Sequence, residues 1–253
     1  MADSAVKKER YRLIDGIRGI CVLGMVIYHT LFDIAAFAGD IAGSPLLNAL
    51  VIVRDLGAGV FIIISGFCFF SEKHHLRRFI ILFSGGIIIT AVTYIVMPEA
   101  YVIYGILTFM AVSGAVMIPL DRIFGHIPPS AGLTVSLLLF AVLFRVNYAY
   151  IGTYDTVLLY LPVSWYANYL TAFFGFPFDG FTSGDYFPLL PWIFVYFAGY
   201  FLRRLTEKHG TIKKIMSLRL PFFDICGRYS LYIYLAHQPI VYGTVWLIFT
   251  LCK

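Results

Sequence analysis

The sequence predicts an all-α, polytopic integral membrane protein with about seven transmembrane helices. Of its 253 residues, 60% are hydrophobic and 13% are charged, whereas soluble domains are about half apolar and a quarter charged. The mean hydropathy is +0.84. The net charge of +5 lies mainly in short loops between apolar runs, where basic residues set topology, so no nucleic-acid partner is expected.

The predicted spans follow the apolar runs that are long enough to cross about 30 Å of hydrocarbon. They cover residues 14–38, 47–70, 78–97, 101–119, 131–149, 186–203 and 223–250. We expect the last one to begin as an interfacial or broken helix before Arg228. Residues 1–12 form a polar, basic tail, and residues 13–253 form a single domain. The first apolar run is too long for a signal-peptide core, so we interpret it as an uncleaved anchor.

The loop charges alternate along the chain and predict the orientation. Loops on one side are rich in Lys and Arg, whereas three on the other side have none: 39–46, 98–100 and 150–185. The positive-inside rule then places the N-terminus in the cytoplasm and the C-terminus outside, in the plasma (inner) membrane. Residues 157–175 are apolar enough for an eighth span, but a crossing there would place the basic run 203–219 outside. We therefore expect an external interfacial or re-entrant helix.

A ladder of ionisable residues in the first span is the strongest functional signal. At about 100° per residue, its members share one helix face within roughly 60°: Asp15, Arg18, His29 and Asp33. Such groups are expensive in lipid, normally face the protein interior or a wet cavity, and usually mark function. Asp33 is one turn above His29 and is placed to accept its hydrogen bond, which would raise the basicity of the imidazole. The alternative is a structural His–Asp pair that joins two helices.

Two other spans carry polar groups. Arg54 is expected near the level of Asp33 and is placed either to pair with it or to extend to the outer interface. In the last span, His237 and Gln238 precede Pro239. Proline cannot donate a backbone hydrogen bond, so a kink is expected there, with a free carbonyl among polar side chains. That arrangement suits a ligand site, whereas a lone histidine is more often a packing residue.

The predicted external segment 173–192 is dense in aromatic residues, Gly and Pro. It is either an interfacial aromatic belt or a mouth where sugar rings stack, with Asp179 or Asp185 holding a hydroxyl or amine. The four cysteines show no metal-ligand spacing, so we expect no metal site and small, buried thiols.

Three motifs in order carry a family resemblance. They are Arg12-Leu-Ile-Asp15-Gly-Ile-Arg18-Gly with His29 eleven residues later, Gly184-Asp185-Tyr-Phe-Pro-Leu-Leu-Pro-Trp192, and Gly227-Arg228-Tyr-Ser-Leu-Tyr-Ile-Tyr-Leu-Ala-His237-Gln238-Pro239. Together they resemble a bacterial membrane family related to heparan-α-glucosaminide N-acetyltransferase, over nearly the whole chain. The spacing of Arg18 and His29 is also similar to that in the wider membrane acyltransferase superfamily that O-acetylates surface glycans.

The resemblance implies that acetyl-CoA, a cytosolic co-substrate, donates its acetyl group to an extracytoplasmic amino sugar or glycan. It also implies that Arg18 and His29 are the important pair. In the lysosomal heparan enzyme, Asn stands at the position that matches His29, and the proposed catalytic histidine lies further along. No histidine lies between Thr30 and Lys73 in this chain, so heparan specificity does not transfer with the resemblance.

The polar residues fit this reaction as a set. The helical rise from Arg18 to His29 is about 16 Å, comparable to an extended pantetheine arm. We expect His29, oriented by Asp33, to act as general base, with an acyl-histidine as the variant mechanism. The expected cofactor-binding residues are Asp15, Arg18 and Arg228. The expected substrate-binding residues are Arg54, Asp185, His237 and Gln238.

Two other functional classes stay open at this stage. Intramembrane Asp, Arg and His residues also serve proton-coupled transporters, although no inverted repeat is visible in the sequence. A non-catalytic membrane scaffold would use the ladder only to join helices. The bilayer is a partner in every case, and a homo-oligomer is one outcome for the quaternary structure.

Overall fold

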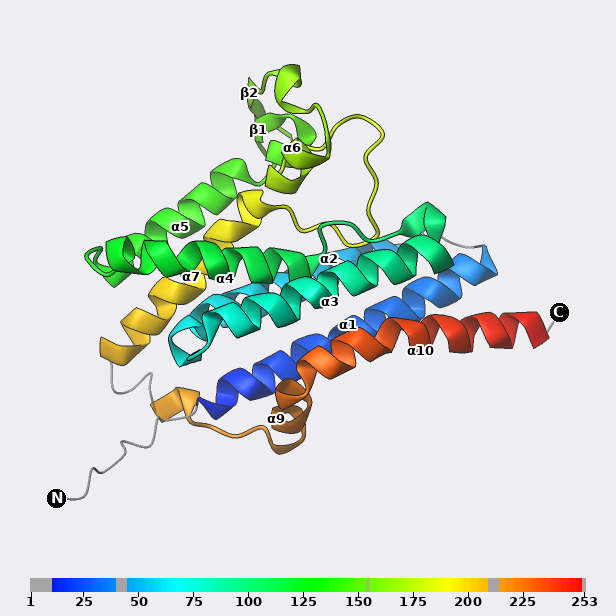
Figure 1. Ribbon diagram of the computed structural model, residues 1–253, viewed down its shortest axis with the longest axis horizontal. Helices are drawn as coiled ribbons and strands as arrows, with labels where there is room; N and C mark the ends of the chain where they lie inside the picture. The colour runs from blue at the N-terminus through cyan, green and yellow to red at the C-terminus, as the bar shows by residue number, and fades with distance from the viewer. Residues whose placement is uncertain (1–10, 40–44, 154, 209–213, 252–253) are drawn as a thin grey trace. The chain divides into compact units, whose positions relative to one another are not determined.

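A computed structural model describes residues 11–39, 45–153, 155–208 and 214–251 (Figure 1). Helices dominate these residues, and the only sheet among them is a two-stranded hairpin. The predicted all-α class is therefore confirmed.

Five described helices are long and apolar enough to cross a membrane. They are α1 (Arg12–Ala38), α2 (Pro45–Phe67), α3 (His75–Val96), α4 (Ile106–Phe124) and α5 (Pro129–Leu143), the last counted with the turn that follows it. Two more helices have a similar length, α7 (Leu189–Lys208) and α10 (Ser230–Leu251), but include polar residues such as Arg203 and His237. The chain is thus an integral membrane protein, and the count of seven spans stays a prediction.

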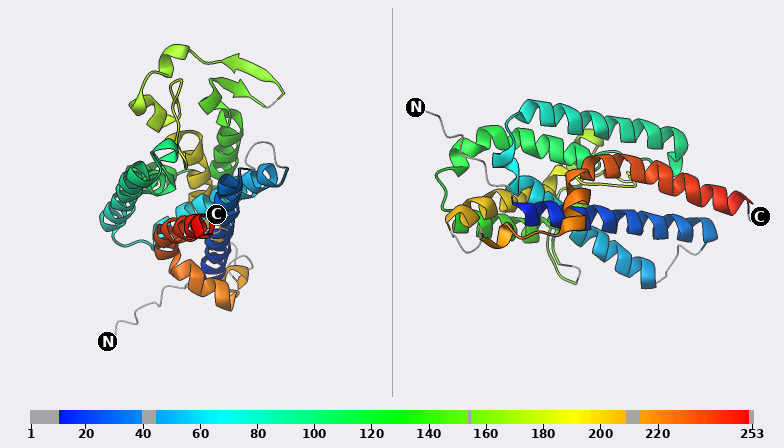
Figure 2. Two further views of the ribbon diagram at one scale, coloured as in Figure 1. Left: turned by 90° about the vertical axis from the view of Figure 1, so that its right-hand side faces the viewer. Right: turned by 90° about the horizontal axis from the view of Figure 1, so that it is seen from below.

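The chain divides into two compact units. The first comprises residues 1–61 and 206–253, and the second comprises residues 62–205, so the boundaries fall inside α2 and α7. In the first unit, α1 lies alongside α10 and the short helix α9 (Pro221–Arg228) (Figures 1 and 2). The predicted broken start of the last span is confirmed, because Tyr229 separates α9 from α10. The single-domain expectation stays a prediction.

Glycines allow α1 and α9 to touch through their backbones. A Cβ atom added to Gly227 would stand 1.8 Å from the carbonyl oxygen of Asp15, and one added to Gly19 would stand 2.0 Å from that of Phe223. Small residues permit this kind of close approach between membrane helices. The crossing holds the cytoplasmic end predicted for α1 against the segment that leads into α10.

The second unit uses the same device. Added Cβ atoms at Gly66 and Gly199 would each lie 2.0 Å from a carbonyl oxygen of the facing helix, so the end of α2 packs directly on α7. Helices α3 and α4 also lie side by side. They meet at Gly86, where an added Cβ atom would stand 2.3 Å from the hydroxyl of Thr108.

The expected helix over residues 157–175 is wrong for most of its length. Its first part is strand β2 (Val157–Tyr160), which pairs antiparallel with β1 (Tyr150–Gly152). A 3-10 turn and then the short helix α6 (Tyr169–Phe174) follow. Valine, leucine and tyrosine suit a paired strand, and Pro162 cannot continue a helix past the strand. Only the last six residues before Gly175 are α-helical.

Candidate functional site

The polar ladder of α1 lies within the first unit and faces its other helices. Helix α1 is continuous from Arg12 to Ala38, so the rise from Arg18 to His29 is about 16 Å. Asp15 and Asp33 are 8% and 2% exposed, and Arg18 and His29 are half-buried. The backbone at Asp15 touches α9, and the outer residues of the ladder contact α10.

Two histidines form the centre of this site. The imidazole of His29 on α1 lies against that of His237 on α10, with ring centroids 5.0 Å apart and ring planes tilted by 52°. Aromatic rings flank the pair, because Tyr28 meets His29 edge-on at 5.1 Å and Tyr234 lies 5.5 Å from His237. Helix packing therefore joins two residues that are more than 200 positions apart.

The hydrogen bonds of His237 define its tautomer. Its Nδ1 lies 2.6 Å from the backbone carbonyl oxygen of Tyr234. A carbonyl oxygen can only accept, so Nδ1 carries the proton and Nε2 carries the lone pair. The side chain is 8% exposed, and no described residue hydrogen-bonds to Nε2. The site thus contains a buried imidazole nitrogen, Nε2 of His237, that can accept a hydrogen bond.

Asp33 pairs across the helices and not along α1. Both of its carboxylate oxygens face the amide nitrogen of Gln238, at 3.3 and 3.5 Å. The expected hydrogen bond from His29 to Asp33 is not among the contacts of the described residues. The sequence could not show that an amide from α10 occupies this carboxylate. The other amide atom, Gln238 Oε1, is buried without a hydrogen bond from any described group.

Arg54 reaches the same region from α2. Its guanidinium forms an ion pair with Asp55, with N–O distances of 2.7 and 2.8 Å, in place of the expected pair with Asp33. It also donates to the Tyr28 hydroxyl at 3.4 Å and lies over the Tyr28 ring. Because Tyr28 touches His29, a positive charge lies one residue away from the histidine pair.

The expected cofactor-binding residues gather where α1 crosses α9. Asp15 and Arg18 form an ion pair at 3.3 Å. Arg18 precedes Gly19, Arg228 follows Gly227, and the backbones of these two glycines touch. Arg228 is exposed. The crossing therefore carries two arginines, a residue type that binds phosphate groups through paired hydrogen bonds.

Asp185 belongs to the second unit. Its carboxylate accepts a hydrogen bond from the backbone N–H of Ile106, at 3.2 Å, where α4 begins. Nearby, the hydroxyl of Ser183 binds both the N–H and the carbonyl of Ile103. These bonds hold the segment before α4 in a non-helical form, which explains why α4 starts at Ile106 and not at the predicted residue 101. In the structure Asp185 is a capping residue.

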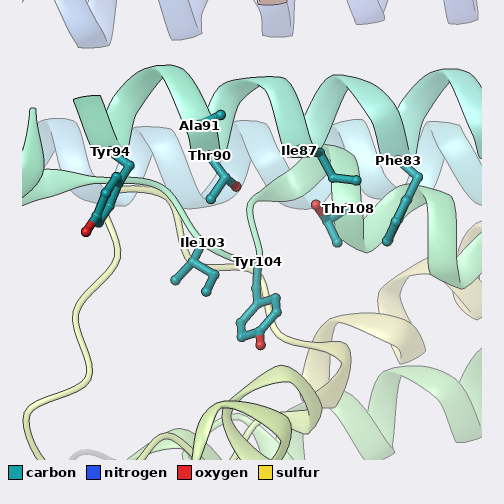
Figure 3. A pocket seen from close by; sticks show the side chains of 8 residues that line it. All are labelled: Phe83, Ile87, Thr90, Ala91, Tyr94, Ile103, Tyr104 and Thr108. Carbon is teal, nitrogen blue, oxygen red and sulfur yellow. The ribbon is translucent and has the colours of Figure 1, made fainter. Parts of the chain in front are cut away.

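A groove between α3 and α4 was not visible in the sequence. Its volume is about 410 Å³, and it lies in the second unit (Figure 3). Side chains such as Phe83, Ile87 and Ile103 make most of its wall, with hydroxyls from Thr108 and Tyr104. Tyr104 has a φ angle of 57°, which is uncommon for a bulky residue. The apolar lining suits a hydrocarbon chain better than a nucleotide.

No group of three or more His, Cys, Asp and Glu side chains that could hold a metal ion occurs within the described ranges. Two groups of the site were not predicted from the sequence, the Tyr234 carbonyl and the Tyr28 ring. Both lie one turn or less from a predicted histidine, so helical spacing from His237 and His29 was the signal that could have found them.

Residues 10–239 match the family model described as heparan-alpha-glucosaminide N-acetyltransferase, catalytic. The chain belongs to this family. The predicted family resemblance is therefore confirmed, and with it the class of membrane acetyltransferase. Comparison with curated proteins and with solved structures found no match.

The match extends from before α1 to Pro239, so it includes all the candidate residues of both α1 and α10. An acetyltransferase needs a group that accepts a proton from its acceptor. The side chains of the site with that chemistry are the imidazoles of His29 and His237 and the carboxylate of Asp33.

Proposed function

We propose that this protein transfers the acetyl group of cytosolic acetyl-CoA to an amine or hydroxyl of an extracytoplasmic amino sugar or glycan, in the plasma membrane. The observation that carries the proposal is the contact between His29 and His237 beside the Asp33–Gln238 pair. The family match supplies the reaction class. We infer the acyl donor and the acceptor class from the residues of the site.

The chemistry requires one proton acceptor. The nitrogen or oxygen of the acceptor attacks the thioester carbonyl carbon, a new C–N or C–O bond forms, and the C–S bond breaks. His29 takes the proton that the acceptor loses and then returns it to the departing thiolate. Half-buried His29 is the better placed of the two imidazoles to meet a substrate, because His237 is almost fully enclosed.

Charged and polar residues of α1 and the helices around it are proposed to support binding. Arg18 and Arg228 are proposed to hold the phosphates of acetyl-CoA, with Asp15 orienting Arg18 through their ion pair. The positive charge of Arg54, held by Asp55, is proposed to stabilise the oxyanion that develops on the thioester carbonyl. Gln238 is proposed to bind the acceptor through its unpaired amide oxygen. The expected contact of Asp185, a residue of the second unit, with the acceptor stays a prediction.

Reconstituted vesicles test this function. Labelled acetyl-CoA is supplied on one side and glucosamine on the other, and the acetylated sugar is counted. Replacing His29 with Ala should reduce transfer by about 10²–10⁴-fold while the purified variant keeps its thermal stabilisation by CoA. His126→Gln is the matched control, because His126 is an exposed histidine whose Nδ1 also faces a backbone carbonyl.

Each result has a definite meaning. Wild-type transfer by the His29→Ala variant would refute the catalytic role of that residue. Glucosamine flux without an acetylated product would favour a proton-coupled transporter. Absence of both transfer and stabilisation by CoA would favour a non-catalytic scaffold.

A further inference from the structure

We propose that His237 is a positioning residue that accepts a hydrogen bond from His29 and thereby selects which nitrogen of His29 acts as the base. This inference rests on the proposed acetyl transfer. It gives His237 the orienting role that the sequence assigned to Asp33. Its support comes from the tautomer, the spacing and the burial of the two rings.

The tautomer of His237 makes it an acceptor toward His29. Nδ1 donates to the carbonyl of Tyr234 at 2.6 Å, so Nε2 presents a lone pair. Both groups belong to α10 and are one turn apart. The direction of this polarity is therefore fixed within one helix, without any contribution from α1.

The spacing of the rings allows a hydrogen bond after a small rotation. Two imidazoles joined by an N–H···N contact of about 3 Å have ring centres roughly 5 Å apart, because each nitrogen is about 1 Å from its ring centre. The observed separation is 5.0 Å, with a tilt of 52°. Rotation of His29 about its terminal side-chain torsion, which is broad for histidine, would align the N–H with Nε2.

The other hydrogen-bond donors near His237 already have partners. The amide of Gln238 faces Asp33, and the guanidinium of Arg54 is held by Asp55 and Tyr28. The imidazole of His29 is the ring donor that contacts His237. A buried acceptor without a donor is unfavourable, so this contact has a physical reason to form.

The contact with His237 determines which nitrogen of His29 can act as the base. A neutral imidazole has one N–H and one lone pair. If the N–H points to His237, the lone pair lies on the opposite nitrogen, which is then the one left to accept a proton from the substrate. When His29 gains the acceptor's proton, Nε2 of His237 stabilises the resulting imidazolium through the same hydrogen bond.

Two substitutions at His237 separate this role from packing. In His237→Gln the amide oxygen can replace Nε2 as an acceptor, whereas His237→Phe keeps a ring but has no acceptor. We expect the Gln variant to retain turnover within about tenfold of the wild type and the Phe variant to lose about 100-fold or more in kcat. The KM for acetyl-CoA and the thermal stabilisation by CoA should stay unchanged in both, with His126→Gln as the control.

Nitrogen NMR of imidazole-labelled wild-type protein provides a readout that is independent of activity. We expect His237 to be neutral with its proton on Nδ1, and His29 to be neutral with one tautomer and a scalar coupling to His237 Nε2. A proton on Nε2 of His237, or a mixture of tautomers at His29, would overturn the proposal. So would equal kcat in folded Phe and wild-type proteins, or equal losses in folded Gln and Phe variants.

The two proposals fail in different ways. If the NMR signals show the coupled pair but no acetylated product forms with any acceptor, the positioning inference stands as a hydrogen-bonded pair and the proposed transfer is refuted. If transfer occurs and depends on His29 but the coupling is absent, the transfer stands and the role of His237 is refuted.

Discussion

The crossing of α1 and α9 offers a sharp test of how the site is assembled. Replacing Gly227 with Ala adds a single methyl group at the closest backbone contact. That carbon would stand 1.8 Å from the carbonyl oxygen of Asp15 and 2.7 Å from its carbon, whereas ordinary contact begins at 3.4 Å. The obstacle is backbone, so no side-chain rotation can relieve the clash. The two helices must instead separate.

The size of the effect follows from this overlap. Relief of the clash needs a shift of roughly 1.5 Å, which forfeits much of the van der Waals contact along the crossing. Overpacking usually costs 1–3 kcal/mol and occasionally more. Because the contact is between two backbones, we expect a loss of about 3 kcal/mol in the free energy of unfolding. For a chain of this size that corresponds to a decrease of about 6–12 °C in Tm.

The matched control lies on the facing helix. Gly24 in α1 has no atom within 4 Å of an added Cβ, so Gly24→Ala should gain about 0.5–1 kcal/mol from helix propensity. Thermal unfolding of both variants in one detergent measures the difference. Unfolding of Gly227→Ala at or above the temperature of Gly24→Ala would refute the close crossing. If CoA raised the Tm of Gly227→Ala by more than it raises the Tm of the wild type, the proposed contribution of this crossing to CoA binding would be refuted.

Three further predictions concern other contacts. A double-mutant cycle with Asp33→Ala and Gln238→Ala should give a coupling of about 0.5–1.5 kcal/mol, and additive losses in unfolding free energy would contradict the observed pair. Asp185→Ala should cost about 1 kcal/mol in thermal stability through loss of the cap on Ile106, whereas Asp185→Asn should keep it; equal melting of the two would argue against capping. Burial raises the pKa of Tyr166 to about 12, so its stabilising effect should be complete below pH 10 and decline as the pH rises from 10 to 12. The stability of Tyr166→Phe, followed by unfolding across this range, should be less dependent on pH, and identical profiles would contradict it.

Local sequence patterns predicted the helices well where a single apolar period decides the structure. The predicted first span, 14–38, and helix α1 end at the same residue, because Gly39 follows with a left-handed φ of 76° that suits a helix end. The break before the last span also followed from local signals, because Gly227 and Arg228 interrupt the apolar run. Prediction was weaker where the secondary structure depends on which segments pair with each other, as in the hairpin that contains Val157.

The candidate site was predictable in its residues but less so in its pairings. Helical periodicity placed His29 and Asp33 on one face, and the last span supplied His237 and Gln238. The sequence does not show which of these residues meet, because a hydrogen bond between α1 and α10 depends on how far the helices slide along each other. The carboxylate of Asp33 therefore pairs with Gln238 on α10 and not with His29, one turn away on α1.

Pro239 affects the same helical turn of α10 that fixes the imidazole of His237. Proline has no N–H, so the carbonyl of Leu235 accepts no helical hydrogen bond from it, yet α10 continues through this residue. The preceding carbonyl, that of Tyr234, holds the imidazole of His237. Side chain and proline thus act on consecutive carbonyls of one turn. A tautomer fixed in this way exists before any substrate arrives, so the enzyme need not organise it during the reaction, which is the condition under which a positioned base is most effective.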